Sequence, residues 1–250
     1  MSALQSHMRH AAAAGRATEQ VGPFLATFSP DSTNPFVNYA IPDDGALPTP
    51  SDVDALAAAY RRRSLLPRVE YLVDTAPTAD AVLLAAGWSV ERRIPVMLCP
   101  PGAAVALPAP AGLELVVPDT DADFIGMITA QNEAFGQSDP VGPSDAVNAR
   151  KRLHDGGFAV LARDAATGEP AGGGVAEAVV DGTSEVAGIA VRTPFRRRGL
   201  GAAITAFLTT AVHAAGGRTV FLTPAGVPEQ RMYARVGYQP AGDMLHVSLS

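Results

Sequence analysis

One segment combines residue types that could bind an anion. Residues 196–202 read Arg-Arg-Arg-Gly-Leu-Gly-Ala, and a helical apolar pattern through Ala203, Ile204 and Phe207 follows directly. Backbone N–H groups at a helix N-terminus and the positive end of the helix dipole attract anions, and glycines let a diphosphate approach the backbone closely. Arginines add paired hydrogen bonds to phosphate oxygens. The segment therefore predicts a site for a phosphorylated ligand.

The glycine spacing disfavours two other phosphate-binding motifs. The chain contains no GxxxxGK[ST], and neither Gly199-Leu200-Gly201 nor Gly172-Gly173-Gly174 extends into GxGxxG. A nucleotide-binding protein is thus the weaker alternative, and it would bind ATP.

Periodicity in the second half of the chain predicts the element order βααβββαβαβ. The predicted sheet is mostly antiparallel, because the turn signal Asp181-Gly182 joins two strands of a meander. The expected elements are a strand at 113–117, a helix capped at Asp119, Thr120 or Asp121, a second helix capped by Ser144, strands at 157–162, 171–180 and 184–191, a helix at 200–215, a strand at 219–223, a helix at 228–236 and a strand around 245–248.

The first half predicts strands at 24–28, 69–73 and 94–98 and helices near 52–63 and 79–86, so the fold class is α+β. The uncharged Pro, Ala and Gly stretch at 100–112 indicates an interdomain connector. We therefore expect a first half at 1–105, a connector at 106–112 and a second domain at 113–250.

A weak repeat relates the two halves. Residues 85–88, Ala-Ala-Gly-Trp, and residues 235–238, Arg-Val-Gly-Tyr, both indicate a helix that stops at glycine before an aromatic residue and a strand. Strands at 69–72 and 219–222 precede the two helices at comparable positions. The pattern favours a duplicated architecture.

The segment Arg196-x-x-Gly199-x-Gly201-Ala202 resembles the [RQ]xxGxG[AG] signature of the GNAT superfamily of N-acetyltransferases. Val191 lies where the fourth strand of that fold ends, and residues 231–238 around Tyr233 resemble its LYxxxGF segment. The resemblance covers roughly residues 113–250 and implies a GNAT fold, a twisted and mostly antiparallel sheet flanked by helices. The first half would be a degenerate GNAT-like repeat in a tandem arrangement.

The resemblance also implies a cosubstrate and its binding residues. Acetyl-CoA would bind without a metal, its pantetheine arm on the backbone of the fourth strand and its pyrophosphate on the turn that follows. The residues implied are Ile189, Ala190 and Val191 on the strand, and Arg196, Arg197, Arg198, Gly199, Leu200, Gly201 and Ala202 on the turn.

Two catalytic residues are implied in the same way. Tyr233 resembles the residue that protonates the departing thiolate, and a phenol keeps its proton at neutral pH. Glu185 resembles the general base of one branch of the family, and Glu177 is the second candidate. The position of Tyr233 corresponds to Leu83 in the first half, which cannot donate a proton. The first half is therefore predicted to be catalytically empty.

A second basic segment does not share this chemistry. Residues 60–66 read Tyr-Arg-Arg-Arg-Ser-Leu-Leu, so serine and leucine replace both glycines. The segment also ends a predicted helix, where the dipole favours cations rather than anions. We assign it no cofactor.

Composition excludes several other classes of protein. The chain has 250 residues, 47% of them hydrophobic, with a formal net charge of −6, which argues against a nucleic-acid binder. It lacks a long apolar run, so neither a membrane span nor a signal peptide is expected. The only cysteine, Cys99, fits a small buried residue in a reducing compartment, the cytoplasm. His154 and His213 lack the spacing of a metal pair.

The expected function is acetyl transfer from acetyl-CoA to a primary amine by direct attack. The alternative is a non-catalytic acyl-CoA-binding sensor or scaffold of the same fold. The acceptor, a small molecule or a peptide, is not encoded by a shared motif, since specificity lies in loops. Residues 132–143 are expected to border it, with Asp139 attracting a cationic amine. The sequence allows a homodimer.

Overall fold

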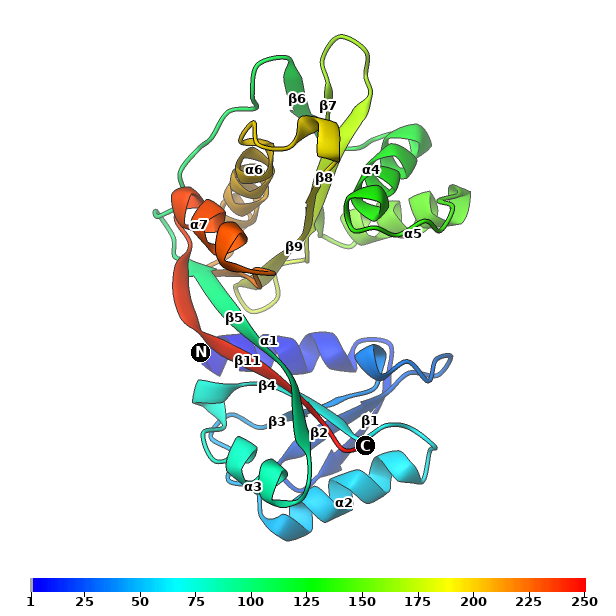
Figure 1. Ribbon diagram of the computed structural model, residues 1–250, viewed down its shortest axis with the longest axis vertical. Helices are drawn as coiled ribbons and strands as arrows, with labels where there is room; N and C mark the ends of the chain where they lie inside the picture. Colours follow the sequence, from blue (N-terminus) through cyan, green and yellow to red (C-terminus); the bar gives the residue numbers. More distant parts are fainter. Residues whose placement is uncertain (1) are drawn as a thin grey trace. The chain divides into compact units, whose positions relative to one another are not determined.

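The computed structural model describes residues 2–250 and divides them into two compact units (Figure 1). Unit 1 contains the residues up to Val96 together with Pro240–Ser250, and unit 2 contains Met97–Gln239. The predicted mixed α/β class, with a mostly antiparallel sheet, is confirmed. Within the described residues, no helix is long and apolar enough to cross a membrane.

From β6 to α7, unit 2 has the predicted element order, whereas the last predicted strand belongs to unit 1. Its strands pair in the order β5-β10-β9-β8-β7-β6, with α4 and α5 on one face of the sheet and α6 and α7 on the other (Figure 1). The elements are β6 (Leu113–Val116), α4 (Asp121–Ala134), α5 (Pro143–His154), β7 (Phe158–Asp164), β8 (Pro170–Ala176), β9 (Thr183–Val191), α6 (Leu200–Ala214), β10 (Thr219–Leu222), α7 (Val227–Val236) and the last residues of β5 (Ser89–Cys99).

Local chemistry sets most of these boundaries. Thr120 caps α4 in a capping box with Asp123, as the sequence predicts. The predicted cap of α5 at Ser144 is wrong, because Pro143 already occupies the first turn and Gly142 is the N-cap. The Gly142 amide instead donates to the Asp145 carboxylate at 2.8 Å.

The second hairpin has the predicted turn. Asp181 and Gly182 both have positive φ angles, 52° and 77°, as a type I′ turn requires. Regular pairing of β8 stops at Ala176, however, whereas the sequence predicts a strand to residue 180. Beyond it the Glu177 amide donates to Glu185 O at 2.9 Å, and an isolated bridge joins Val180 to Thr183.

Glycines in β8 let helices pack on both faces of the sheet. A Cβ atom at Gly173 would lie 2.5 Å from Cγ of Met127 in α4, and one at Gly174 would lie 2.9 Å from Cγ2 of Ile204 in α6. The Gly172–Gly174 run is thus explained by close packing.

Unit 1 repeats this plan in a reduced form. Its strands pair in the order β1-β2-β3-β4-β11-β5, with α1 on one face and α2 and α3 on the other (Figure 1). The sequence patterns did not predict α1, β1 and β3. Strand β3 is very short, α1 is rich in Ala and polar residues, and β1 is rich in polar residues. The elements are α1 (Ser2–Ala13), β1 (Ala17–Val21), β2 (Phe24–Phe28), β3 (Ala40–Pro42), α2 (Pro50–Arg61), β4 (Arg68–Leu72), α3 (Ala79–Ala85), the first part of β5, and β11 (Gln239–Ser248).

Each unit includes a strand from the other half of the sequence. Strand β11 follows α7 along the chain but pairs with β4 over Met244–Ser248. Strand β5 follows α3, and its last residues, Met97–Cys99, pair with β10. The compact units therefore differ from the domain limits expected at 105 and 113. The stretch at 100–112 lies inside unit 2, where the Val105 amide donates to the Val236 carbonyl at 2.9 Å.

The helix ends that suggested a repeat have the same hydrogen bond. The Trp88 amide donates to Leu83 O at 3.1 Å, and the Tyr238 amide donates to Tyr233 O at 3.2 Å. The glycines between them, Gly87 and Gly237, both have positive φ angles. Both turns are Schellman-type C-caps, so Leu83 and Tyr233 occupy equivalent positions.

A buried charged cluster ties β11 into unit 1. The fully buried Arg68 guanidinium pairs with Glu70 of β4 and, at 2.9 Å, with Glu91 of β5. It also donates to Nδ1 of His246 in β11 at 2.8 Å. Because arginine can only donate, Nδ1 is the acceptor, and the neutral ring has its proton on Nε2. Burial lowers the pKa of His246, so folding favours the neutral ring.

This arrangement predicts acid-sensitive folding of unit 1. The pKa of His246 is lower in the folded than in the unfolded chain, so its contribution to stability is lost as pH falls below about 6.5, the ordinary histidine value. His246→Asn keeps an acceptor for Arg68 but cannot titrate. Urea unfolding of both proteins at about pH 7.5 and about pH 5.5, followed by fluorescence of the single tryptophan, Trp88, tests this. We expect the wild type to lose more stability than the variant, and equal losses would contradict the role of His246.

Candidate active site

Strands β9 and β10 separate and open the sheet of unit 2. Their parallel pairing covers only Thr183–Glu185 of β9 and Thr219–Phe221 of β10, whereas β9 continues to Val191 beside β8. Backbone groups of β9 beyond Glu185 therefore face a fork. Side chains bind two of these groups, the Gly188 and Val191 carbonyls, and any group left over needs water or a ligand as its hydrogen-bonding partner.

A bulge in β9 accompanies this separation. Gly173 pairs with Ala190 and Val175 with Ala187, so β9 has one residue more than β8 over this interval. Gly188, inside the bulge, has a φ of +64°, and its carbonyl accepts from Nε2 of Gln131 in α4 at 2.7 Å. Bulges bend a strand and increase its twist, which turns β9 away from β10.

The fork opens into a cavity of about 720 Å³. Its walls come from the end of α4, from β9, from the turn that begins α6, from the residues after β10, and from α7. The lining residues are Ala134, Phe135, Val186, Ala187, Gly188, Ile189, Ala190, Val191, Phe195, Arg196, Arg197, Gly199, Leu200, Gly201, Leu222, Thr223, Ala225, Pro228, Glu229, Met232, Tyr233 and Arg235.

The turn before α6 presents a helix N-terminus to this cavity. Arg197 and Gly199 have left-handed backbones, with φ angles of 64° and 88°, and Gly199 is the N-cap of α6. Because glycine has no side chain to cap the first N–H groups, these remain available to an anion. Close packing also favours glycine at position 201, since a Cβ there would lie 2.9 Å from Sδ of Met232.

The three arginines of the turn have different partners. Arg196 donates from Nε to Val191 O at 2.8 Å and from a terminal nitrogen to Ala134 O at 3.1 Å. Arg198 donates to Ala111 O at 2.7 Å and is not among the lining residues. Arg196 and Arg197 both line the cavity. The structure therefore brings most of the expected binding residues together and places Arg198 and Ala202 outside the lining.

Tyr233 lies on α7, is 7% exposed and lines the cavity. Burial, and secondarily the Glu229 carboxylate, raise the pKa of Tyr233 to about 12. The phenol is therefore protonated at neutral pH. Tyr238, by contrast, is a packing residue, as predicted, with its hydroxyl 2.8 Å from Thr209 Oγ1.

Glu185 lies at the last pairing position between β9 and β10, next to the lining residue Val186. Its carbonyl accepts from the Glu177 amide at 2.9 Å, so the two candidate bases are neighbours. Both residues are half-buried, and neither is part of the lining. Their roles stay predictions.

The sequence analysis missed two ionisable residues of the cavity, Glu229 and Arg235. Glu229 precedes Tyr233 by one helical turn, so helical spacing alone could have placed it on the same face. For Arg235, two residues after Tyr233, no comparable signal exists. Among the described residues, no group of three or more His, Cys, Asp or Glu could hold a metal ion.

In unit 1 the equivalent region between β3 and β4 is filled by side chains of α1. Gln5, which is fully buried, donates to Pro42 O at 2.9 Å and accepts from the Leu72 amide at 3.3 Å. Arg9 donates to Ile41 O at 2.7 Å. Leu72 corresponds in the repeat to Leu222, which lines the cavity of unit 2. These contacts use backbone groups that a ligand would need.

The arginine triplet of unit 1 lies at a helix C-terminus, as expected. Helix α2 ends at Arg61, and Arg62 and Arg63 both pair with Glu19. Arg63 also stacks over the Phe28 ring at 3.9 Å. These contacts engage Arg62 and Arg63, and the absence of a cofactor at the triplet stays a prediction.

Part of the chain is similar to a known protein family, and the whole chain is similar to solved structures. Residues 124–238 match the family model described as "Acetyltransferase (GNAT) family". A GCN5-related N-acetyltransferase from Kribbella flavida is similar at 25% identity, with a TM-score of 0.82, over 99% of this chain and 94% of that one. No curated protein sequence matches the chain.

Two further structures share the fold. A GCN5-related N-acetyltransferase from Sphaerobacter thermophilus has a TM-score of 0.65 at 18% identity, over 91% of this chain and 80% of that chain. A tandem GNAT protein from the clavulanic acid biosynthesis pathway has a TM-score of 0.65 at 15% identity, over 94% of this chain and 83% of that one.

Residues 124–238 are therefore a GNAT domain, and the chain has the fold of tandem GNAT proteins. The match of residues 124–238 to this family supports acyl transfer in general. The predicted fold is confirmed, and the predicted likeness to the GNAT family is confirmed for residues 124–238.

Proposed function

We propose that the chain is an N-acetyltransferase that transfers an acetyl group from acetyl-CoA to a primary amine by direct attack. One observation carries the proposal: a single cavity in the GNAT domain joins an uncapped helix N-terminus, the free strand edge of β9 and a buried, protonated tyrosine. Such a cavity suits an elongated ligand with a phosphate group at one end and a leaving group at the other.

In this proposal backbone groups do most of the binding. The pantetheine arm would add to the edge of β9 through Ile189, Ala190 and Val191. The pyrophosphate would lie on the amides of residues 197–202, with the cationic side chains of Arg197 and Arg235 near it, since both line the cavity.

The chemical step needs two proton transfers. The neutral amine attacks the thioester carbonyl carbon, a C–N bond forms, the C–S bond breaks, and the thiolate takes the hydroxyl proton of Tyr233. The amine loses one proton to a base, for which we propose Glu185, either directly or through water. The acceptor is a small-molecule or peptide amine that approaches past the segment 132–143. The cytoplasm, as inferred from the single cysteine, is the proposed location.

Cofactor binding can be tested with two matched glycines at the ends of α6. Gly199 and Gly216 have similar φ angles, 88° and 91°, and open space at the Cβ position, but only Gly199 lines the cavity. Gly199→Glu should weaken acetyl-CoA binding at least about tenfold by calorimetry, because its carboxylate repels the pyrophosphate. Gly216→Glu carries the same backbone strain and should bind normally. Equal affinities of both variants would contradict the proposed phosphate site.

The role of Tyr233 can be tested by removing its hydroxyl alone. Tyr233→Phe keeps the ring packed, so acetyl-CoA affinity should change little, whereas kcat should fall about 10²- to 10⁴-fold with the loss of the acid. Single-turnover release of free thiol separates chemistry from product release.

A chemical step slowed less than about threefold would remove Tyr233 from the mechanism. Tight acetyl-CoA binding by the wild type without thiol release, for every class of amine tested, would instead favour a non-catalytic acyl-CoA sensor.

A further inference from the structure

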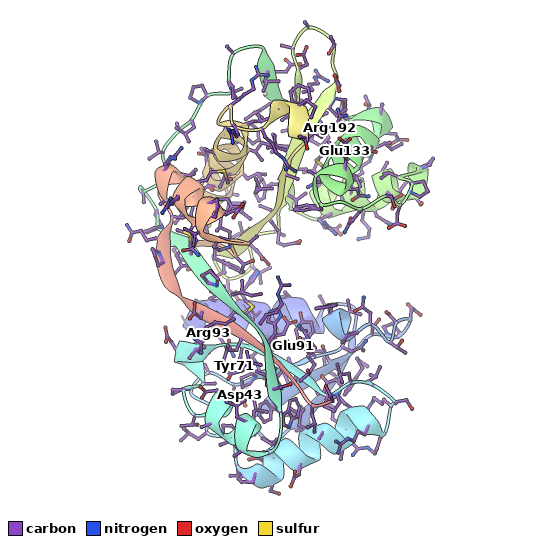
Figure 2. All side chains as sticks on the ribbon, viewed as in Figure 1. Asp43, Tyr71, Glu91, Arg93, Glu133 and Arg192 are labelled. Atoms are coloured by element: carbon purple, nitrogen blue, oxygen red, sulfur yellow. The ribbon has the colours of Figure 1, made fainter. Side chains whose placement is uncertain are left out.

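Two arginines that follow β9 bind the last turn of α4. Arg196 donates to the Ala134 carbonyl at 3.1 Å and to the Val191 carbonyl at 2.8 Å. Arg192 pairs with the Glu133 carboxylate at 2.8 Å, and the two side chains meet in Figure 2. The end of α4 is therefore fixed to the end of β9.

The helix end is a suitable partner for arginine. The carbonyls of the last turn of a helix have no partner within the helix, and the negative end of the dipole favours a cation there. Arg192 extends the contact to β8, since it also pairs with Glu169 at 2.6 Å and donates to Pro170 O at 2.9 Å. Three elements of the domain thus meet at these two side chains.

This junction forms part of the cavity wall. Ala134 and Phe135 at the end of α4 both line the cavity, and the Phe135 side chain is 57% exposed at its edge. Packing alone does not hold so exposed an aromatic residue in place. Its position depends on the helix end that Arg196 and Arg192 hold.

We propose that Arg196 is a positioning residue for the acceptor rather than a ligand of the cofactor phosphates. The inference rests on the proposed function. Both arginines line the cavity, but Nε and one terminal nitrogen of Arg196 already donate to the Val191 and Ala134 carbonyls. Arg196 therefore connects the cofactor turn to the wall of α4, and its loss should disturb acceptor binding more than cofactor binding.

Three variants test this. Arg196→Ala removes the hydrogen bonds, Arg196→Gln keeps neutral N–H donors without the charge, and Arg197→Ala is the matched control on the cofactor side. At saturating acetyl-CoA, Arg196→Ala should raise the KM of the acceptor about tenfold, with Arg196→Gln in between. The Kd of acetyl-CoA should change less than about threefold in both, but rise about tenfold in Arg197→Ala.

A second measurement needs no acceptor. Amide hydrogen exchange at residues 133–136 of the free protein should be faster in Arg196→Ala than in the wild type and unchanged in Arg197→Ala. An unchanged exchange rate in Arg196→Ala would overturn the proposal. So would a tenfold loss of acetyl-CoA affinity in both Arg196 variants with an unchanged acceptor KM, because Arg196 would then act through its charge on the phosphates. A wild type that transfers no acetyl group would refute the proposed function, and the exchange measurement would still decide the role of Arg196.

Discussion

The early end of the β9–β10 pairing at Glu185 is the constraint on which the site depends. A strand edge inside a domain leaves amide and carbonyl groups that must find partners elsewhere, at a free-energy cost comparable to a lost hydrogen bond for each. The bulge at Gly188, held by Gln131, maintains this separation. The same feature lets α6 present its N-terminus at the mouth of the fork and α7 present Tyr233 along its side. An unpaired edge that would weaken an ordinary sheet is here the feature available to bind a ligand.

Unit 1 has the same arrangement of strands and helices but no open fork between its strands. Its fork is filled by Gln5 and Arg9, its arginine triplet ends a helix, and Leu83 stands where unit 2 has Tyr233. Unit 1 keeps the packing of its strands and helices. One of these strands, β11, follows α7 in the sequence and pairs with β4. Because β11 is covalently continuous with α7, folding of unit 1 fixes the strand that follows the proposed catalytic helix. Because His246 is buried in the cluster with Arg68, Glu70 and Glu91, we expect the folding of unit 1 to depend on pH.

Local signals in the sequence were sufficient for most of the fold of unit 2. Capping at Thr120, the turn at Asp181-Gly182 and the glycine stop at Gly237 are set by neighbours within a few residues, so each could be predicted. The strand exchange could not, because pairing of β5 with β10 and of β11 with β4 is decided by contacts between distant segments. The hydrogen-bond partners of Arg196 and Arg198 could not be predicted from the sequence either. Arg196 donates to Ala134 O and Arg198 to Ala111 O, and spacing in the sequence does not reveal such distant partners. No sequence signal marks Arg235 as a residue of the cavity.

We propose that one cofactor binds per chain, in the fork of unit 2. Amide hydrogen exchange measured with and without saturating acetyl-CoA tests this binding site, since backbone groups are proposed to make the contacts. We expect strong protection confined to residues 186–191 of β9 and 197–202 of the turn, with the amide of Leu72 and the segment 60–66 in unit 1 unchanged. Protection in the β3–β4 region or at Arg61–Arg63, without protection of β9, would contradict it.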